Sequence, residues 1–294
     1  MYTYTVIIPH KNVPCLLQRC IDSIPIRDDL HVIIVDDNSD PKIVDFGKFP
    51  GYDRKNTTII FNKEGLGAGH ARNVGLDNIG DTKWVFFCDS DDFFTPYLNE
   101  ALDQYAEADD DMIMFTYNSV YSESLQPCNR SDKTHDRILK AKDNNDYDII
   151  RYKVQIPYCK FIAYKNIKRS NIRYDEVMYS NDVMFAIKIG YISNKIKIDT
   201  NILYTQTERE GSLVKIIKKE SIDCRYRVAK NALQYLKDID RDQYHTNLFS
   251  FCYKYAKINI FLAVNCFFRA LKDTDIKFWY IDIKTCLEYM LTRR

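Results

Sequence analysis

The sequence of 294 residues has little of several features by which protein classes are recognised. Its formal net charge is only +1, which argues against a dedicated nucleic-acid binder, since such proteins are strongly basic. The longest apolar stretch without a charge, residues 258–268, has 11 residues, whereas a membrane-spanning helix needs about 20. The first residues lack the charged and apolar regions of a signal peptide. We therefore expect a cytoplasmic protein, either fully soluble or peripheral at the inner face of a membrane.

Metal-binding and disulfide patterns are also missing. The nine cysteines include no Cys-x-x-Cys pair, their number is odd, and the five histidines are dispersed. This pattern is typical of buried free thiols in a reducing compartment, and it argues against a zinc site.

The near-zero net charge hides an asymmetry along the chain. Residues 213–294 hold 16 Lys and Arg against 9 Asp and Glu, a balance of +7, so the preceding part has 26 against 32, or −6. A basic region of this kind suits contact with an anionic membrane, and it equally suits a normally solvated helical region. We predict a catalytic domain over residues 1–212, with a nucleotide-sugar half (1–110) and an acceptor half (111–212), and a helical region over 213–294.

What the chain does contain is a series of short apolar runs, each ending in a polar or glycine-rich loop. Helical periodicity separates these runs, which predicts parallel βαβ units and an α/β fold. Right-handed crossovers would bring all four loops to one edge of the sheet. The runs are residues 4–9, 31–35, 57–61 and 84–88, and the loops are residues 9–12, 36–40, 62–69 and 89–92.

The loop after the fourth run is Asp89-Ser90-Asp91-Asp92. Three carboxylates so close together repel one another, so a positive group should share the site. Mg²⁺ or Mn²⁺, held by one or two carboxylates and by substrate phosphates, fits this composition. Taken alone, the segment could also be an acidic turn that caps a helix.

Three kinds of site are candidates for this edge of the sheet. A dinucleotide fold would need a glycine where His70 stands, and its glycines would follow the first strand rather than the third. A phosphatase-like site could use an aspartate of the acidic turn as nucleophile, but it leaves Asp36 and Asp37 without a role. A nucleotide-sugar site uses every loop, with one carboxylate for the nucleoside and later ones for the metal on the diphosphate.

Four motifs in order resemble those of family 2 glycosyltransferases, the inverting enzymes with the GT-A fold. The resemblance covers residues 4 to about 110. It implies a mixed, mostly parallel sheet flanked by helices, followed by a helical C-terminal region. The motifs are Val6-Ile7-Ile8-Pro9 through Asn12, Val35-Asp36-Asp37-Asn38-Ser39, Gly69-His70-Ala71-Arg72-Asn73-Val74-Gly75, and the DxD segment Asp89-Ser90-Asp91-Asp92. The chain departs from the family at His10-Lys11, where a tyrosine-containing turn is more usual.

The resemblance also implies roles for individual residues. Asp37 would bind the base of the nucleotide, Asp89 would contact the ribose side, and Asp91 would hold Mn²⁺ or Mg²⁺, with Asp92 as a second candidate ligand. The full set of implied donor-binding residues is Pro9, Asn12, Asp37, Arg72, Asp89, Ser90 and Arg209.

Two further residues lie outside these motifs. Inverting transfer needs a general base for the acceptor hydroxyl, and the family's Glu-Asp pair is matched here by Asn181-Asp182, which makes Asp182 the candidate base. The alternative is that Asp182 is a helix N-cap. Arg209, in a segment resembling the family's Arg-x-Gly-Ser motif, could steady the departing diphosphate, or it could be an exposed loop arginine.

The expected function is metal-dependent, inverting hexosyl transfer from a nucleoside-diphosphate sugar, with UDP as the expected nucleotide. The acceptor would be a hydroxyl of a glycan or lipid-linked saccharide in bacterial surface polysaccharide synthesis. Another metal-dependent nucleotidyl or phosphoryl enzyme and a non-catalytic nucleotide-sugar-binding relative remain as alternatives. Elsewhere, residues 119–147 are expected to form a loop-rich insert, and the spacing of apolar residues predicts one amphipathic helix over residues 249–271.

Overall fold

The computed structural model describes residues 2–209 and 217–291, which form two compact units. The first unit comprises Met1–Val177 and Met184–Glu210, and the second comprises Met178–Val183 and Gly211–Arg294. The predicted domain boundary between residues 212 and 213 lies outside the described residues. Nothing in the sequence predicts that the short segment Met178–Val183 groups with the second unit.

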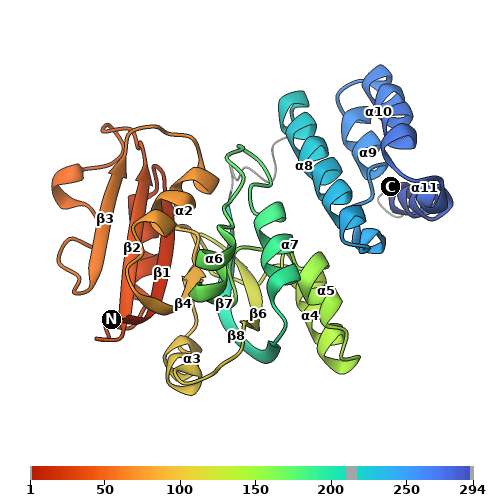
Figure 1. Ribbon diagram of the computed structural model, residues 1–294. Coiled ribbons are helices and arrows are strands. Elements are labelled where there is room, and N and C mark those ends of the chain that lie inside the picture. Colours follow the sequence, from red (N-terminus) through yellow and green to blue (C-terminus); the bar gives the residue numbers. More distant parts are fainter. Residues whose placement is uncertain (1, 210–216, 292–294) are drawn as a thin grey trace. The chain divides into compact units, whose positions relative to one another are not determined.

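The first unit is built on an eight-stranded sheet in the order β3-β2-β1-β4-β7-β6-β8-β5 (Figure 1). The four apolar runs form its parallel half, because β1 pairs with β2 and β4, and β2 pairs with β3, all in parallel. Strand β7 is antiparallel to β4 and β6, which makes the sheet mixed, as predicted. The strands are β1 (Tyr2–His10), β2 (Leu30–Asp37), β3 (Thr57–Asn62), β4 (Thr82–Phe87), β5 (Phe93–Phe94), β6 (Met112–Tyr121), β7 (Lys160–Ala163) and β8 (Ile196–Glu208).

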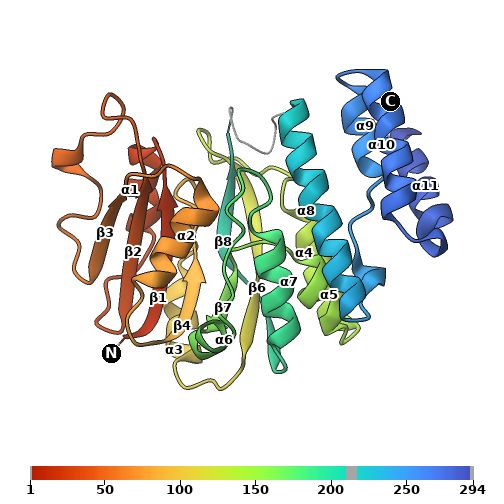
Figure 2. The same cartoon turned by 45° about the horizontal axis from the view of Figure 1, so that its top comes forward.

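Helices cover this sheet. Helix α2 lies over the β1–β2 part of the sheet in both views (Figures 1 and 2). It packs so closely that a Cβ on Gly75 would meet Cγ2 of Ile7 at 2.5 Å, which explains why glycine stands there. The helices of this unit are α1 (Pro14–Asp22), α2 (Ala68–Asp77), α3 (Tyr97–Tyr105), α4 (Asp132–Asp143), α5 (Tyr147–Lys153), α6 (Tyr164–Ser170) and α7 (Val183–Ile192).

The core of the first unit is strongly aromatic. The ring of Phe161 lies 4.9 Å from that of Phe86 and 4.8 Å from that of Phe115, with fully buried Trp84 and Tyr4 around them. Such tilted ring pairs add to the free energy gained from apolar burial. These rings join β1, β4, β6 and β7 in the middle of the sheet.

The second unit is helical, as predicted for the C-terminal region. Its helices are α8 (Lys219–Asp238), η3 (Asp242–Tyr244), α9 (Ser250–Ala256), α10 (Ile260–Asp273) and α11 (Ile276–Leu291). They enclose a separate core that includes Tyr226, Phe249 and Phe251.

Two predictions of local structure were wrong. Residues 119–147 are not a loop, since they contain the end of β6 and the whole of α4. Residues 249–271 do not form one helix: α9 ends at Ala256, and the side chain of Asn259 accepts a hydrogen bond from the backbone N–H of Phe261 to start α10. Apolar periodicity continues through this break and therefore concealed it.

Candidate donor site

The acidic turn follows β4 at the carboxyl edge of the parallel strands, where ligands bind in open α/β sheets. The side chains of Asp89 and Asp91 are 31% and 26% exposed, so both carboxylates are open to a ligand. Each is also held by an arginine: Arg72 Nη2 lies 2.5 Å from Asp89 Oδ1, and Arg209 Nε lies 2.9 Å from Asp91 Oδ2. The positive groups beside these two carboxylates are therefore arginines, from α2 and from the residue after β8, and the metal expected from the sequence stays a prediction.

Asp92 has a different environment. It is only 3% exposed, its Oδ2 accepts a hydrogen bond of 2.7 Å from the Tyr204 hydroxyl, and its Oδ1 accepts one of 2.6 Å from the Thr207 N–H. Burial raises the pKa of Asp92 well above its usual range, and the charges of Asp91 and Asp89 add to this effect. Because both oxygens face protein donors, Asp92 does not fit the role of metal ligand predicted for it. It anchors the turn.

Strand β8 and helix α1 hold the backbone of the turn as well. The Asp89 N–H donates to the Tyr204 hydroxyl at 3.1 Å. The carbonyl of Asp91 accepts from Arg19 Nη2 and from Thr207 Oγ1, both at 2.8 Å. Sequence reasoning missed the supporting role of all three residues. Arg19 belongs to no motif, and Tyr204 and Thr207 lie more than a hundred positions from the turn, in the segment from which only Arg209 was predicted to act.

The two aspartates at the end of β2 have opposite roles. Asp36 is buried and accepts from His10 Nδ1 at 2.8 Å and from the hydroxyl and N–H of Ser39 at 2.5 and 2.9 Å. The Val13 N–H points at His10 Nε2 at 3.2 Å, so the proton of this imidazole belongs on Nδ1. Burial alone would raise the pKa of Asp36, but the hydrogen bonds from His10 and Ser39 outweigh it and lower the pKa. Asp36 is therefore a structural link between the ends of β1 and β2.

Asp37 has one carboxylate oxygen that no protein group satisfies. Its Oδ2 accepts from Lys11 Nζ at 3.2 Å and from the Gly67 N–H at 3.0 Å, whereas its buried Oδ1 has no hydrogen-bond partner. Asn62 is paired with Asp37 in the β2–β3 register, and its buried Nδ2 also has no partner. Residues paired in this way project from the same face of a sheet. A buried acceptor and a buried donor thus stand side by side, and such groups cost free energy until a ligand satisfies them.

Three donor-binding candidates remain, and they lie in loops or strand ends at the same edge of the sheet. Pro9 is in β1 opposite Val35, and Ser90 is buried within the acidic turn. Asn12 has a positive φ of 58°, and its Oδ1 accepts from the Asp40 N–H at 2.7 Å, so its side chain shapes the loop.

Asp182 belongs to the second unit, whereas the other predicted site residues belong to the first. It belongs to the segment Met178–Val183 of the second unit, directly before α7, which begins at Val183. The structure brings the donor and metal candidates together within the first unit, and Asp182 is not among them.

A divalent ion would have to share its coordination with a ligand. No group of three or more His, Cys, Asp or Glu side chains within residues 2–209 and 217–291 is arranged to hold a metal. The available oxygens are those of Asp91 and Asp89 that no arginine occupies. This set fits Mg²⁺ or Mn²⁺, which take one or two carboxylates and complete their coordination with water and substrate phosphates.

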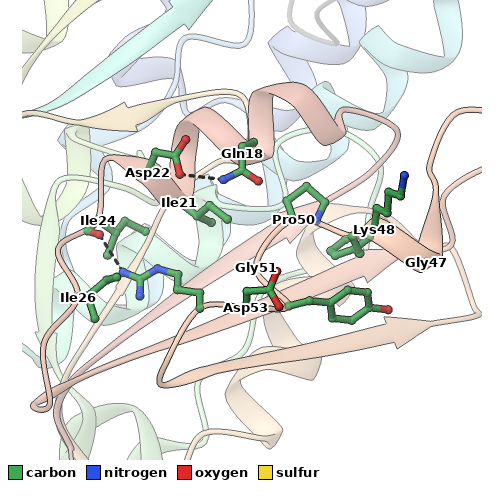
Figure 3. Close-up of a pocket in the computed structure, with 13 residues that line it drawn as sticks. Gln18, Ile21, Asp22, Ile24, Ile26, Gly47, Lys48, Pro50, Gly51 and Asp53 are labelled. Carbon is green, nitrogen blue, oxygen red and sulfur yellow. Dashed lines mark hydrogen bonds between the residues drawn. The ribbon is translucent and has the colours of Figure 1, made fainter.

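A separate cavity of about 590 Å³ lies between the second half of α1 and residues 47–54 (Figure 3). Ile21, Ile24 and Pro50 line it, and at its margin Gln18 donates a hydrogen bond to Asp22 at 2.8 Å. None of the predicted site residues lines this cavity, so it is distinct from the candidate donor site.

Comparison with known proteins decides the family. The family model described as glycosyl transferase family 2 matches residues 5–169, which is more than half of the chain. The chain belongs to glycosyl transferase family 2. The family predicted from the motifs is therefore confirmed. Asp37, Asp89 and Asp91 lie within the residues that the family model matches.

Individual relatives are more distant. A succinoglycan biosynthesis protein, ExoW of Rhizobium meliloti (strain 1021), is 39% identical over 101 residues, which are 33% of this chain and 31% of that protein. The crystal structure of S. aureus TarS in complex with UDP-GlcNAc has a TM-score of 0.60 at 21% identity, covering 79% of this chain and 66% of that one. The mannosyltransferase PcManGT from Pyrobaculum calidifontis, in complex with GDP-Man and Mn²⁺, has a TM-score of 0.53 at 15% identity, covering 98% and 80%.

The chain thus spans about a third of the first of these relatives and two thirds of the second. The structural likeness supports the fold, whose predicted class is confirmed. Within the described ranges, no helix of this family 2 chain is long and apolar enough to cross a membrane.

Proposed function

We propose that this chain transfers a sugar from a UDP-sugar to a hydroxyl of a saccharide acceptor, with inversion at the anomeric carbon. The observation that carries the proposal is the buried pair at the ends of β2 and β3, Asp37 Oδ1 and Asn62 Nδ2. A carboxylate oxygen beside an amide donor complements a base edge that presents an N–H next to a carbonyl. Uracil has such an edge at N3 and its flanking carbonyls.

The same pair discriminates between nucleotides. Cytosine presents an unprotonated N3 at the equivalent position, and a buried carboxylate would repel it. Guanine also has an N–H beside a carbonyl, so size rather than hydrogen bonding would separate it from uracil. The complexes of TarS with UDP-GlcNAc and with UDP favour uracil, since TarS resembles this chain more closely than the GDP-Man complex does.

The acidic turn would receive the diphosphate. Asp91 would hold Mn²⁺ or Mg²⁺, which when bound offsets the negative charge of the leaving diphosphate. Asp89, fixed by Arg72 at 2.5 Å, would face the ribose side. Arg209 lies against Asp91, so its guanidinium is close to where the diphosphate would gain charge.

The acceptor hydroxyl would lose its proton to Asp182 as its oxygen attacks the anomeric carbon. This role rests on the resemblance of the Asn181-Asp182 segment to the family's catalytic pair. The direct displacement needs no enzyme nucleophile. Similarity to ExoW, a succinoglycan biosynthesis protein, supports an acceptor that is a glycan or lipid-linked saccharide of a bacterial surface polysaccharide, and hence a cytoplasmic site of action at the inner face of the membrane.

The base-reading pair is tested by calorimetry with UDP, CDP and GDP in the presence of Mn²⁺. We expect UDP to bind best, and Asp37→Asn to weaken it about tenfold or more, since a hydrogen bond to a charged group contributes about 1.5–3 kcal/mol. Asp28→Asn, at an exposed position outside the site, is the matched control. Equal binding of UDP and CDP, or unchanged affinity in Asp37→Asn, would refute the proposal.

Turnover separates the candidate functions. Incubation with a panel of UDP-sugars and saccharide acceptors should release UDP and form a glycoside. Release of inorganic phosphate or pyrophosphate would indicate a phosphoryl or nucleotidyl enzyme. Tight UDP binding with no turnover of any donor would indicate a non-catalytic relative.

A further inference from the structure

The exposed apolar side chains of this protein are concentrated near its C-terminus. Of the twenty large apolar side chains that are exposed in the described part of the chain, ten lie between residues 258 and 287. Apolar residues scattered singly over a surface are normal, but a contiguous group marks an interaction site. We call the group on the last two helices the α10–α11 surface; its members are Ile260, Phe261, Val264, Phe267, Phe268, Ile276, Tyr280, Ile281 and Leu287.

Helix α10 is apolar on two opposite sides. Its buried residues, Ala263, Cys266 and Ala270, follow one another at spacings of three and four and face the core of the second unit. Phe261 and Phe268, seven positions apart and therefore on one side of the helix, are 75% and 64% exposed. Packing against the core of the second unit explains why the first side of α10 is apolar. It does not explain the apolar residues on the outward side, which no described residue covers.

Helix α11 repeats this arrangement and is adjacent to α10 in both views (Figures 1 and 2). Cys286 and Asp282 are buried, whereas Ile276 and Tyr280 are 77% and 76% exposed. The two outward sides together present aromatic and aliphatic side chains on neighbouring helices.

Basic side chains are on the whole more exposed than acidic ones on this part of the chain. Arg269, Lys277 and Lys284 remain at least half exposed although each lies near an acidic residue, and Lys272 is exposed. The exposed acid Glu288 stands beside Lys284 at 3.9 Å. Three acidic residues pair with bases of the second unit, and of these Asp273 and Asp282 are almost buried whereas Asp275 is 43% exposed: the pairs are Asp273–Lys230 at 2.8 Å, Asp275–Lys237 at 2.9 Å and Asp282–His245 at 2.8 Å.

We propose that the α10–α11 surface binds the face of an anionic lipid bilayer. Exposed phenylalanines next to lysines are typical of helices that lie in the plane of a membrane interface. A bilayer fits better than a second copy of this chain, because in a symmetric dimer the same surface meets itself, so the exposed lysines of one copy would face a surface that carries the same positive charges. Anionic headgroups complement these charges, as they complement the +7 balance of residues 213–294.

The test is co-sedimentation of the full chain with vesicles of phosphatidylcholine alone or with about one-third phosphatidylglycerol. Binding should be at least about fivefold stronger to the anionic vesicles and should weaken with salt, since each lysine near such a surface contributes about fivefold. The double variant Phe261→Ser, Phe268→Ser should reduce binding about tenfold or more. Lys272→Glu with Lys284→Glu should abolish the preference for anionic lipid.

The matched control is Ile26→Ser, which removes an apolar side chain that is 68% exposed on the first unit and should leave vesicle binding unchanged. All variants should keep the far-ultraviolet circular dichroism and the urea midpoint of the unchanged chain, which shows that they are folded without any use of UDP binding, so this test is independent of the proposed function. The proposal fails if the unchanged chain does not sediment with anionic vesicles, or if the phenylalanine variant binds them equally well. A dimer in light scattering that the phenylalanine variant dissociates would assign the surface to a second copy instead.

Discussion

Replacing Asp92 tests whether this residue anchors the acidic turn or belongs to its chemistry. Asp92→Ala removes the acceptor from two buried donors, the Tyr204 hydroxyl and the Thr207 N–H. Each buried donor left without a partner costs about 1–3 kcal/mol. The tyrosine cannot simply turn away, because its oxygen also accepts from the Asp89 N–H. Losing a buried carboxylate offsets part of this cost, so we expect a loss of about 3 kcal/mol.

For a unit of this size, that loss corresponds to a fall of about 6–12 °C in melting temperature. The measurement must report on the first unit alone. The chain has two tryptophans, fully buried Trp84 in the first unit and Trp279 in the second, so fluorescence in a Trp279→Phe background follows the unfolding of the first. Urea midpoints in the same background provide the free energy.

Asp91→Ala is the matched control, since Asp91 is a neighbouring carboxylate that is 26% exposed and paired with the half-exposed Arg209. Such a partly solvated pair contributes about 0–1 kcal/mol. Asp92→Ala should therefore destabilise the first unit clearly more than Asp91→Ala. If the two variants were equally stable, or their order were reversed, the anchoring role of Asp92 would be refuted.

Three further predictions follow from other parts of the molecule. Gly190→Ala should cost about 1–3 kcal/mol in urea unfolding, because the new Cβ would clash with the backbone of Arg151, whereas Gly80→Ala has open space and should change little. The pKa of Asp36 is lowered in the folded state, so the ionised carboxylate stabilises the fold fully above the unfolded pKa of about 3.9, and this stabilisation is lost as the pH falls through the folded pKa. The urea midpoint of the unchanged chain should therefore fall between about pH 5 and pH 2, and Asp36→Asn should make this fall smaller. Asp182→Asn should keep UDP affinity while transfer, followed by UDP release, falls about a hundredfold or more, and retained transfer would exclude Asp182 as the base.

The parallel half of the sheet could be predicted because its signals are local. Each strand is a continuous apolar run, and a polar loop marks its carboxyl end. The part of the first unit that follows β5 was harder to predict from the sequence. Residues 119–147 are mostly polar and lack a strong periodicity, because α4 buries only Ile138 and Ala141. The break before α10 could not be predicted because the spacing of apolar residues is the same in α9 and α10 and continues across the break.

In the candidate site, too, some residues could be predicted from local sequence and others could not. The motifs placed Asp37, Asp89 and Asp91 correctly at one edge, because position along a strand is sufficient for that. They could not distinguish Asp92 from Asp91, since the difference comes from Tyr204, 112 residues away. Asn62 was missed although it directly follows the third apolar run. Its significance depends on the register that pairs it with Asp37, and register is a property of the assembled sheet.

The attachment of the acidic turn to β8 has a consequence for the protein during its synthesis. The family match ends at residue 169, yet the hydrogen bonds that fix Asp89 and Asp92 come from Tyr204 and Thr207. At about 5–20 residues per second, a ribosome needs roughly 6–20 seconds to add the intervening 115 residues. A nascent chain that already carries all four motifs therefore still lacks the contacts from β8 to the acidic turn. A fragment cut at residue 169 would keep the recognisable sequence of a donor domain and its Arg72–Asp89 pair, but it would leave the Asp92 carboxylate without both of its hydrogen-bond donors.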